Sequence, residues 1–201
     1  MSHGNLYGHV MCALDVETTG TEPGYHEVIQ IAAVPLDQNY EPHKQYRPFY
    51  LPGIAPEFPE RQAPDAKAKT GLDAKKLAEE CVSQVRAADL MDEWFMGLGL
   101  PADKRLIPLC HNYGFERTMM LAWLGPDTYH TIWDGRARDS QVLAAAINDM
   151  HYWQGSGHPF SEISLVSVCQ RLGIPLENAH NALADCLATA KAYRAMISLF
   201  G

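Results

Sequence analysis

The pattern of apolar positions in the first 50 residues predicts three β-strands joined by short connections. An apolar run at residues 10–16 ends at the turn-forming pair Thr19-Gly20, which is typical of a buried strand followed by a turn. Residues 27–36 are rich in β-branched side chains and predict a second strand, and residues 44–50 alternate loosely and predict a third. Because the connections are short, we expect the three strands to pair antiparallel.

Prolines dominate the next segment. Five of them, spaced between residues 48 and 64, predict a stretch that is neither helix nor central strand. A long irregular segment inside a small fold is usually functional, so we expect it to border the substrate cleft. Four lysines follow it, and we favour a solvated helix start over phosphate contacts for them: Lys67, Lys69, Lys75 and Lys76.

The second half of the chain reads as helices separated by two short strands. Apolar residues at a spacing of about 3.6 predict one long helix over residues 73–97. The elements expected after it are a strand at 106–110, a helix at 115–124, a strand at 129–133, a helix from the Asp139 cap through 150, and tail helices at 165–172 and 181–200. In the last helix, one apolar stripe is formed by Leu183, Leu187, Ala190, Tyr193, Ile197 and Phe200.

This order of elements predicts an α/β fold. We expect a mixed five-stranded sheet, with three antiparallel strands first and then two parallel ones, and helices on both faces. Neither an internal repeat nor a linker is visible, so we expect one domain over residues 1–201 with a core at about 10–200.

Composition and charge narrow the classes of function. The net charge of −8 weighs against tight binding to duplex nucleic acid, which needs a basic surface, but not against an enzyme whose bound cations supply positive charge. The five cysteines form no CxxC pair and predict buried, reduced thiols. With neither a signal-peptide pattern nor an apolar run long enough for a bilayer, we expect a cytoplasmic protein without membrane contact.

Two acids at the end of the first strand are the first candidate for chemistry. Side chains alternate along a strand, so Asp15 and Glu17 project to the same side. Two such acids repel each other and are costly to desolvate, which a divalent cation would offset. The alternative is a strand that simply ends in solvated acids, and the D-x-E pattern alone is common.

Two further segments carry candidates. His180 precedes the last predicted helix and Asp185 lies one turn inside it, so a metal-binding aspartate and a histidine able to deprotonate water could face each other. The alternative for His180 is a surface residue that caps the helix. His111 and Asn112 follow the fourth predicted strand, and Glu116 opens a helix, where an acid also suits the helix dipole.

Together these segments resemble the DnaQ-like (DEDDh) 3′–5′ exonucleases of the RNase H-like superfamily. The likeness covers about residues 10–195, with DVETTG, HNYGFE and HNALADCLATA in the order of the three family motifs. Each motif is weak alone, and the three in order are specific.

The resemblance implies roles for particular residues. Asp15 would bridge two Mg²⁺ or Mn²⁺ ions, Glu17 and Asp185 would complete one site, Glu116 would hold the second ion through water, and His180 would be the general base. The residues implied to position the terminal nucleotide are Thr18, Thr19, His111, Asn112 and Phe115.

One residue departs from the family pattern. The second motif ordinarily has aspartate where this chain has Glu116, which keeps the charge and adds roughly 1.5 Å of reach. A carboxylate that acts through water absorbs this change better than a direct ligand, so we expect activity to survive, with an altered metal preference as a further possibility.

The implied activity is the release of nucleoside 5′-monophosphates from 3′ ends, with single-stranded or frayed DNA favoured. An RNA-trimming exoribonuclease of the same family is an alternative, and the 2′-hydroxyl is read by small local contacts. A non-catalytic module that binds strand ends or a polymerase is another, if Glu116 disables the second metal site. A homodimer or a polymerase partner stays open.

Overall fold

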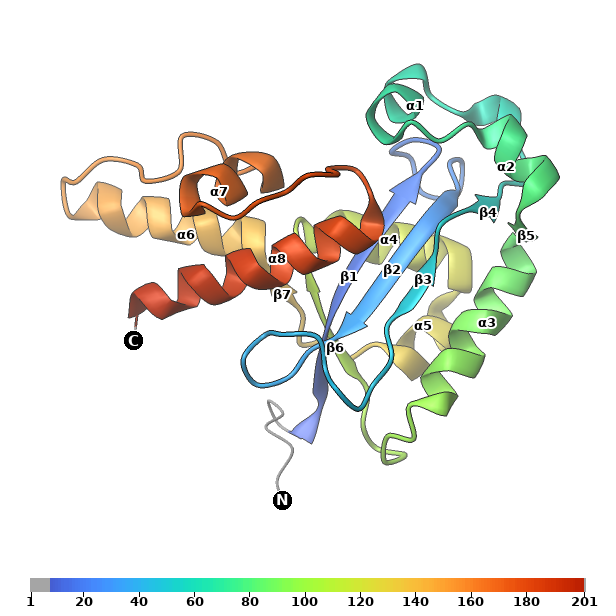
Figure 1. Ribbon diagram of the computed structural model, residues 1–201, viewed down its shortest axis with the longest axis horizontal. Helices are drawn as coiled ribbons and strands as arrows, with labels where there is room; N and C mark the ends of the chain where they lie inside the picture. The colour runs from blue at the N-terminus through green and yellow to red at the C-terminus, as the bar shows by residue number, and fades with distance from the viewer. Residues whose placement is uncertain (1–7, 201) are drawn as a thin grey trace.

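The fold is built around a five-stranded mixed sheet (Figure 1). The computed structural model describes residues 8–200. The strands lie in the order β3 (Phe49–Leu51), β2 (Val28–Pro35), β1 (Val10–Thr18), β6 (Leu106–Cys110) and β7 (Arg138–Asp139). β1, β2 and β3 pair antiparallel, whereas β6 runs parallel to β1 and β7 parallel to β6. The predicted fold class is therefore confirmed.

Alternation along β1 sends its side chains into two different cores. Cys12 and Leu14 face a core closed by α3 (Gln84–Gly97), α4 (Tyr113–Leu124) and α5 (Pro126–Ile132). Met11 and Ala13 face the opposite side, where α8 (Ala182–Ile197) crosses the sheet. Helices cover both faces, so β1 is buried along nearly its whole length at the centre of the molecule (Figure 1).

Small residues allow α8 to pack against elements on two sides. Ala182, Cys186 and Ala190 lie on β1 and β2, and Ala188 and Ala192 pack toward α6 (Ser140–Trp153) and α7 (Leu165–Leu172). The predicted stripe is confirmed for the part that meets the sheet. The prediction is wrong at the end of the stripe, because the α-helix ends at Ile197. Phe200 lies in the 3-10 turn Ser198–Phe200 that follows and is 54% exposed.

The predicted third strand is mostly wrong. Only Phe49–Leu51 pairs with β2. The ring nitrogen Nδ1 of His43 accepts hydrogen bonds from the main-chain N–H groups of Gln45 and Tyr46, which holds the preceding residues in a turn. Pro48 has no N–H to donate to a ladder.

The predicted helix over 73–97 is two helices. α2 (Ala74–Glu80) ends before β5 (Val82–Ser83), which pairs with β4 (Ile54–Ala55), and α3 then begins. Ser83 starts the new helix because its hydroxyl accepts a hydrogen bond from the Arg86 N–H. Val82 and Val85, two of the apolar residues whose spacing predicted a single helix here, are exposed.

The predicted strand at 129–133 is also wrong, because residues 126–132 form α5. Pro126 occupies the first turn, where its missing N–H costs nothing, and Tyr129 and Ile132 are buried one helical turn apart. The last strand is instead the polar pair Arg138–Asp139, which has no apolar signature. α4 begins at Tyr113 and α6 ends at Trp153, close to the expected bounds.

The proline-rich segment is more ordered than expected. It contains β4, the 3-10 turn Pro59–Arg61 and the start of α1 (Pro64–Thr70), with Pro59 and Pro64 at the first positions of their turns. Within residues 8–200 no helix is both long and apolar enough to cross a bilayer.

Candidate active site

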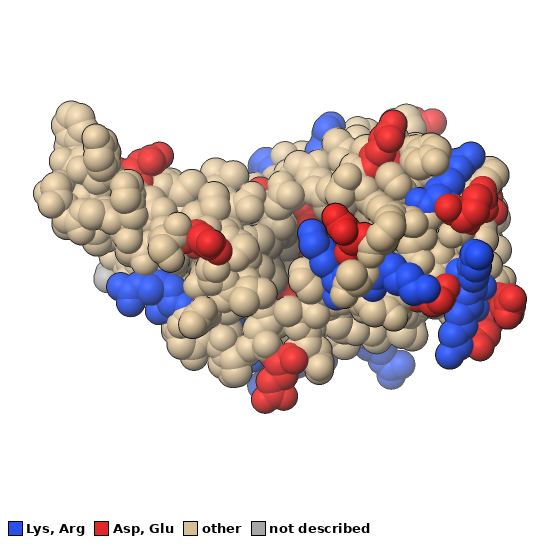
Figure 2. All heavy atoms as spheres, turned by 90° about the horizontal axis from the view of Figure 1, so that it is seen from above, with Lys and Arg blue, Asp and Glu red and all other residues tan. Residues whose placement is uncertain are grey.

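A cavity of about 570 Å³ opens at the carboxyl end of β1. Its walls come from β1, α1, the start of α4, the start of α7 and the loop before α8, and Figure 2 shows the molecule hollowed with acidic atoms inside the hollow. Ligands commonly bind outside the carboxyl ends of parallel strands, and β1 and β6 both end here.

The end of β1 delivers two carboxylates to this cavity. Asp15 and Glu17 both line it, as strand alternation predicts, while Leu14 packs into the core on the other face. The pairing with β2 shifts register between Glu17 and Thr18. Such irregularities re-aim side chains and are common beside active sites.

The start of α8 brings a third carboxylate to the cavity. Gln30, opposite Glu17 on β2, accepts a hydrogen bond of 2.7 Å from the Ala182 N–H through its side-chain oxygen, and this fixes the helix end over the sheet. Asp185 lies one turn further on and accepts a 3.1 Å hydrogen bond from the His180 N–H. Potential ligand atoms of Glu17, His180 and Asp185 lie within 4.8 Å of one another.

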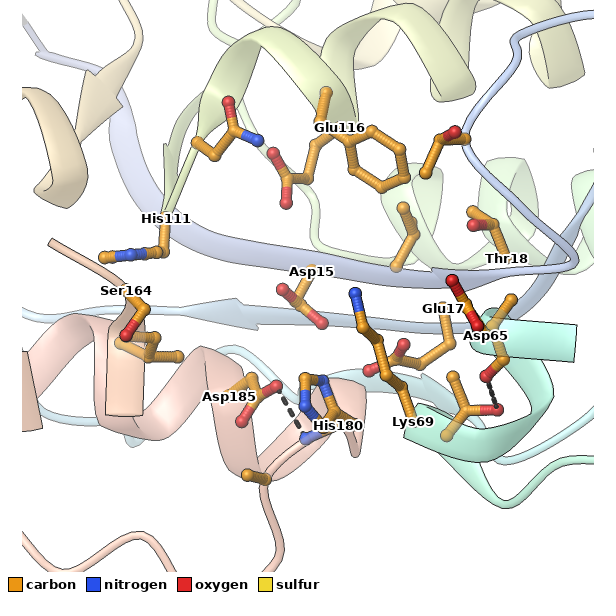
Figure 3. Close-up of a pocket in the computed structure, with 18 of the residues that line it drawn as sticks. Asp15, Glu17, Thr18, Asp65, Lys69, His111, Glu116, Ser164, His180 and Asp185 are labelled. Carbon is orange, nitrogen blue, oxygen red and sulfur yellow. Dashed lines mark hydrogen bonds between the residues drawn. The ribbon is translucent and has the colours of Figure 1, made fainter. Parts of the chain in front are cut away.

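The start of α4 brings a fourth carboxylate. Glu116 is only 3% exposed and lines the same cavity. Figure 3 shows Asp15 between Glu116 on one side and Asp185 on the other, so the acids form one cluster with Asp15 at its centre.

Asp139 fixes the loop that carries Glu116. One of its carboxylate oxygens accepts hydrogen bonds from the N–H groups of Asn112, Gln141 and Val142, and the other accepts a 2.8 Å bond from the Tyr113 N–H. It therefore caps the start of α4 as well as α6. Its oxygens are fully engaged in capping, as the sequence suggested.

The four acids disfavour one another's charged forms. Burial raises the pKa of Asp15 well above its ordinary value, and the charges of Glu116, Glu17 and Asp185 raise it further. Burial and the Asp185 charge raise the pKa of Glu17 to about 7. Burial also raises the pKa of Glu116 and of Asp185, in the latter case against the lowering effect of His180.

This cluster fits a divalent cation. One oxygen each of Glu116 and Asp185 is buried without a hydrogen-bond partner among the described residues, an arrangement that is costly unless something else binds it. Clustered carboxylate oxygens are the ligands that Mg²⁺ and related ions prefer.

The predicted nucleotide-positioning residues divide into two groups. Thr18, His111, Asn112 and Phe115 line the cavity. Thr19 does not, because it is fully buried and its hydroxyl accepts the Glu27 N–H, so its position differs from the expected contact with a nucleotide.

His111 joins three segments. Its Nε2 donates to the Ile163 carbonyl at 2.9 Å and its Nδ1 hydrogen-bonds the Ser140 hydroxyl at 2.8 Å. Burial lowers the pKa of His111. Both ring nitrogens are thus occupied, and the ring ties the end of β6 to the starts of α6 and α7.

Known proteins resemble this chain in sequence and in fold. No protein-family model matches it. Ribonuclease T of Yersinia pseudotuberculosis and that of Yersinia pestis are each 25% identical in an alignment of 211 residues that covers 97% of this chain and 87% of the relative. Their similarity to this chain over nearly its whole length confirms the resemblance to the DnaQ-like (DEDDh) 3′–5′ exonucleases that was drawn from the three motifs.

Solved structures agree on the fold. E. coli exonuclease I in complex with a dT13 oligonucleotide matches with a TM-score of 0.72 at 19% identity over 96% of this chain. Exonuclease I from Methylocaldum szegediense matches with a TM-score of 0.70 at 21% identity over 94%. The chain spans only 42% and 40% of the lengths of these two proteins.

Three cavity residues escaped the sequence analysis: His26, Asp65 and Ser164. Lys69, for which the sequence favoured a solvated helix start over phosphate contacts, also lines the cavity. These four residues come from a turn, a seven-residue helix and a helix cap, and none belongs to a spaced motif. A Cβ at Gly20 would lie 2.4 Å from the His26 ring, so glycine at this position leaves room for that ring.

Proposed function

We propose that this protein is a divalent-metal-dependent 3′–5′ exonuclease that releases nucleoside 5′-monophosphates from 3′ ends. The observation that carries the proposal is the convergence of four carboxylates, from three distant segments, in one cavity. Buried acids that raise one another's pKa destabilise the fold, so their retention at one place is best explained by a cation that binds them.

The acids divide into two sets around Asp15. Glu17 and Asp185 lie on one side and would hold one Mg²⁺ or Mn²⁺ ion with Asp15, whereas Glu116 lies on the other side and would hold a second with the same residue. When bound, such cations supply Lewis acidity, lower the pKa of water and offset the charge of the phosphate. A protein of similar fold, E. coli exonuclease I, was solved in a zinc-bound form with single-stranded DNA, which supports the involvement of a divalent ion.

His180 is proposed as the general base. Its main-chain N–H is anchored on Asp185, while the residue itself is exposed at the mouth of the cavity. The imidazole would accept a proton from the attacking water and pass it to solvent. Its backbone lies in the left-handed region at a φ of 65°, which places the ring at the turn before α8.

Single-stranded or frayed DNA is the substrate that we favour. The net charge of −8 disfavours a broad grip on duplex phosphates, and a relative in fold was solved with a dT13 oligonucleotide. RNA is the second candidate, because the similar proteins in sequence are named Ribonuclease T. All four acids remain, so we do not favour a non-catalytic module. We also retain the prediction of one domain.

A digestion series tests the proposal. The protein is incubated with 5′-labelled single-stranded DNA, duplex DNA and RNA, each with Mg²⁺, Mn²⁺ or EDTA, and Asp15→Asn serves as the control. We expect a ladder shortened from the 3′ end in both metals and none in EDTA or with Asp15→Asn. Equal cleavage by Asp15→Asn would point to a contaminating nuclease, and no cleavage of any substrate would refute the proposal.

A further inference from the structure

Helix α1 presents a single basic side chain to the acidic cavity. Among the described residues that line it, Lys69 is the only lysine or arginine. In Figure 3 its side chain extends from α1 into the cavity, on the side to which Asp15 and Glu17 point, and Figure 2 shows basic side chains along one rim of the hollow.

None of the ion pairs between described residues includes Lys69, although several carboxylates share its cavity. Lys67, two residues earlier on the same helix, instead binds Asp73 at 2.6 Å and does not line the cavity. Two lysines on one short helix therefore differ in their partners.

The space between Lys69 and the four acids is suited to an anion, because metal ions held by the acids would attract it from one side and the Lys69 ammonium from the other. A phosphate there would meet metal-held positive charge on the side of the acids and the ammonium on the side of α1. Lysine binds phosphate as a compact point charge and needs no fixed approach geometry.

We infer that Lys69 binds the phosphate of the 3′-terminal nucleotide, the group that is cleaved and then retained in the released nucleoside 5′-monophosphate. This inference rests on the proposed function. It makes Lys69 a substrate-binding residue that recognises charge rather than base or sugar, and it predicts that the enzyme holds its product more tightly than the corresponding nucleoside.

Binding of two small molecules tests this directly. Thymidine 5′-monophosphate and uncharged thymidine are titrated calorimetrically, with saturating Mg²⁺, into the parent protein, Lys69→Ala, Lys69→Arg and the matched control Lys67→Ala. We expect Lys69→Ala to weaken binding of the monophosphate by about tenfold and to leave thymidine binding unchanged. Lys69→Arg should keep most of the affinity, and Lys67→Ala should match the parent.

A salt series provides a second measurement. The slope of log Kd for the monophosphate against log[NaCl] should shrink by about one in Lys69→Ala and not in Lys67→Ala, because one phosphate contact is lost. Equal monophosphate binding by parent and Lys69→Ala would overturn the inference. The inference would also be overturned if the only effect of Lys69→Ala were tighter binding of Mn²⁺. In that case the role of the ammonium would be to neutralise the acids when no metal is bound.

The exonuclease activity and the phosphate-binding role of Lys69 can be refuted independently of each other. If the parent binds the monophosphate with the predicted dependence on Lys69 but degrades no oligonucleotide, the exonuclease activity is refuted and the phosphate site stands. If the parent degrades oligonucleotides and Lys69→Ala does so with unchanged KM and kcat, only the inference about Lys69 is wrong. Melting curves of the variants control for folding.

Discussion

At the scale of single residues, two cavity positions have left-handed backbones. Asn112 has a φ of 79° and is the N-cap of α4, and His180 has a φ of 65° and precedes the N-cap of α8 by one residue. The first turn of each helix supplies an acid. Asparagine adopts this region readily, and histidine is also enriched there among non-glycine residues. Asparagine at position 180 is therefore expected to keep the turn while it removes the imidazole.

This gives a test of the general base that is separate from backbone strain. We expect His180→Asn to keep the turn and the affinity for Mn²⁺ while kcat falls by a factor on the order of 100 or more, the usual loss when a general base is removed. His180→Ala should lose a similar factor. Turnover near the parent rate in His180→Asn, measured on a labelled oligonucleotide, would mean that the ring takes no proton.

The role of Glu116 as a metal ligand can be tested by shortening its side chain and by removing its charge. Because its carboxylate is buried with one unpaired oxygen, we expect Glu116→Asp to retain activity within about tenfold and Glu116→Ala to lose more than 100-fold, as a lost metal ligand would. Steady-state rates in Mg²⁺ and Mn²⁺ measure both. Equal, undiminished turnover in the two variants would remove Glu116 from the metal site.

At the scale of elements, Asp139 connects β7, α4 and α6 through one carboxylate. We expect Asp139→Ala to lower the free energy of unfolding by about 2 kcal/mol, because two helix starts lose their cap at once. Urea denaturation measures this. Asp127, in the first turn of α5 and not the N-cap of that helix, provides the control. If Asp139→Ala is no less stable than Asp127→Ala, the double cap contributes nothing.

The sequence predicted the elements whose signals are local. β1, β6 and α7 have continuous apolar runs or capped periodic stripes, and the acids at the end of β1 follow from strand alternation. β7 is two polar residues long and is a strand only because it pairs with β6. Lys69 and His26 reach the cavity through tertiary packing, which no local spacing encodes.

At the scale of the whole molecule, the acid cluster couples stability to pH and to metal. Without divalent cations, the unfolded chain loses the Glu17 proton near its ordinary pKa of 4.5, whereas the folded protein keeps it until about 7. The folded state thus binds more protons in this window, and its stability falls as pH rises through it. A shift of this size corresponds to about 3 kcal/mol at most.

Thermal melting in EDTA from pH 5 to pH 8 isolates this effect when the parent is compared with Glu17→Gln. The comparison also removes the contribution of His111, which is present in both proteins. Burial lowers the pKa of His111, so its contribution to stability rises with pH in the same window. We expect the parent to lose several degrees of Tm relative to Glu17→Gln between pH 5 and pH 8. Mn²⁺ should restore the parent most strongly at pH 8, where the ligands are deprotonated. Parallel curves for the two proteins in EDTA would mean that the Glu17 carboxyl is not destabilised by burial among the other acids.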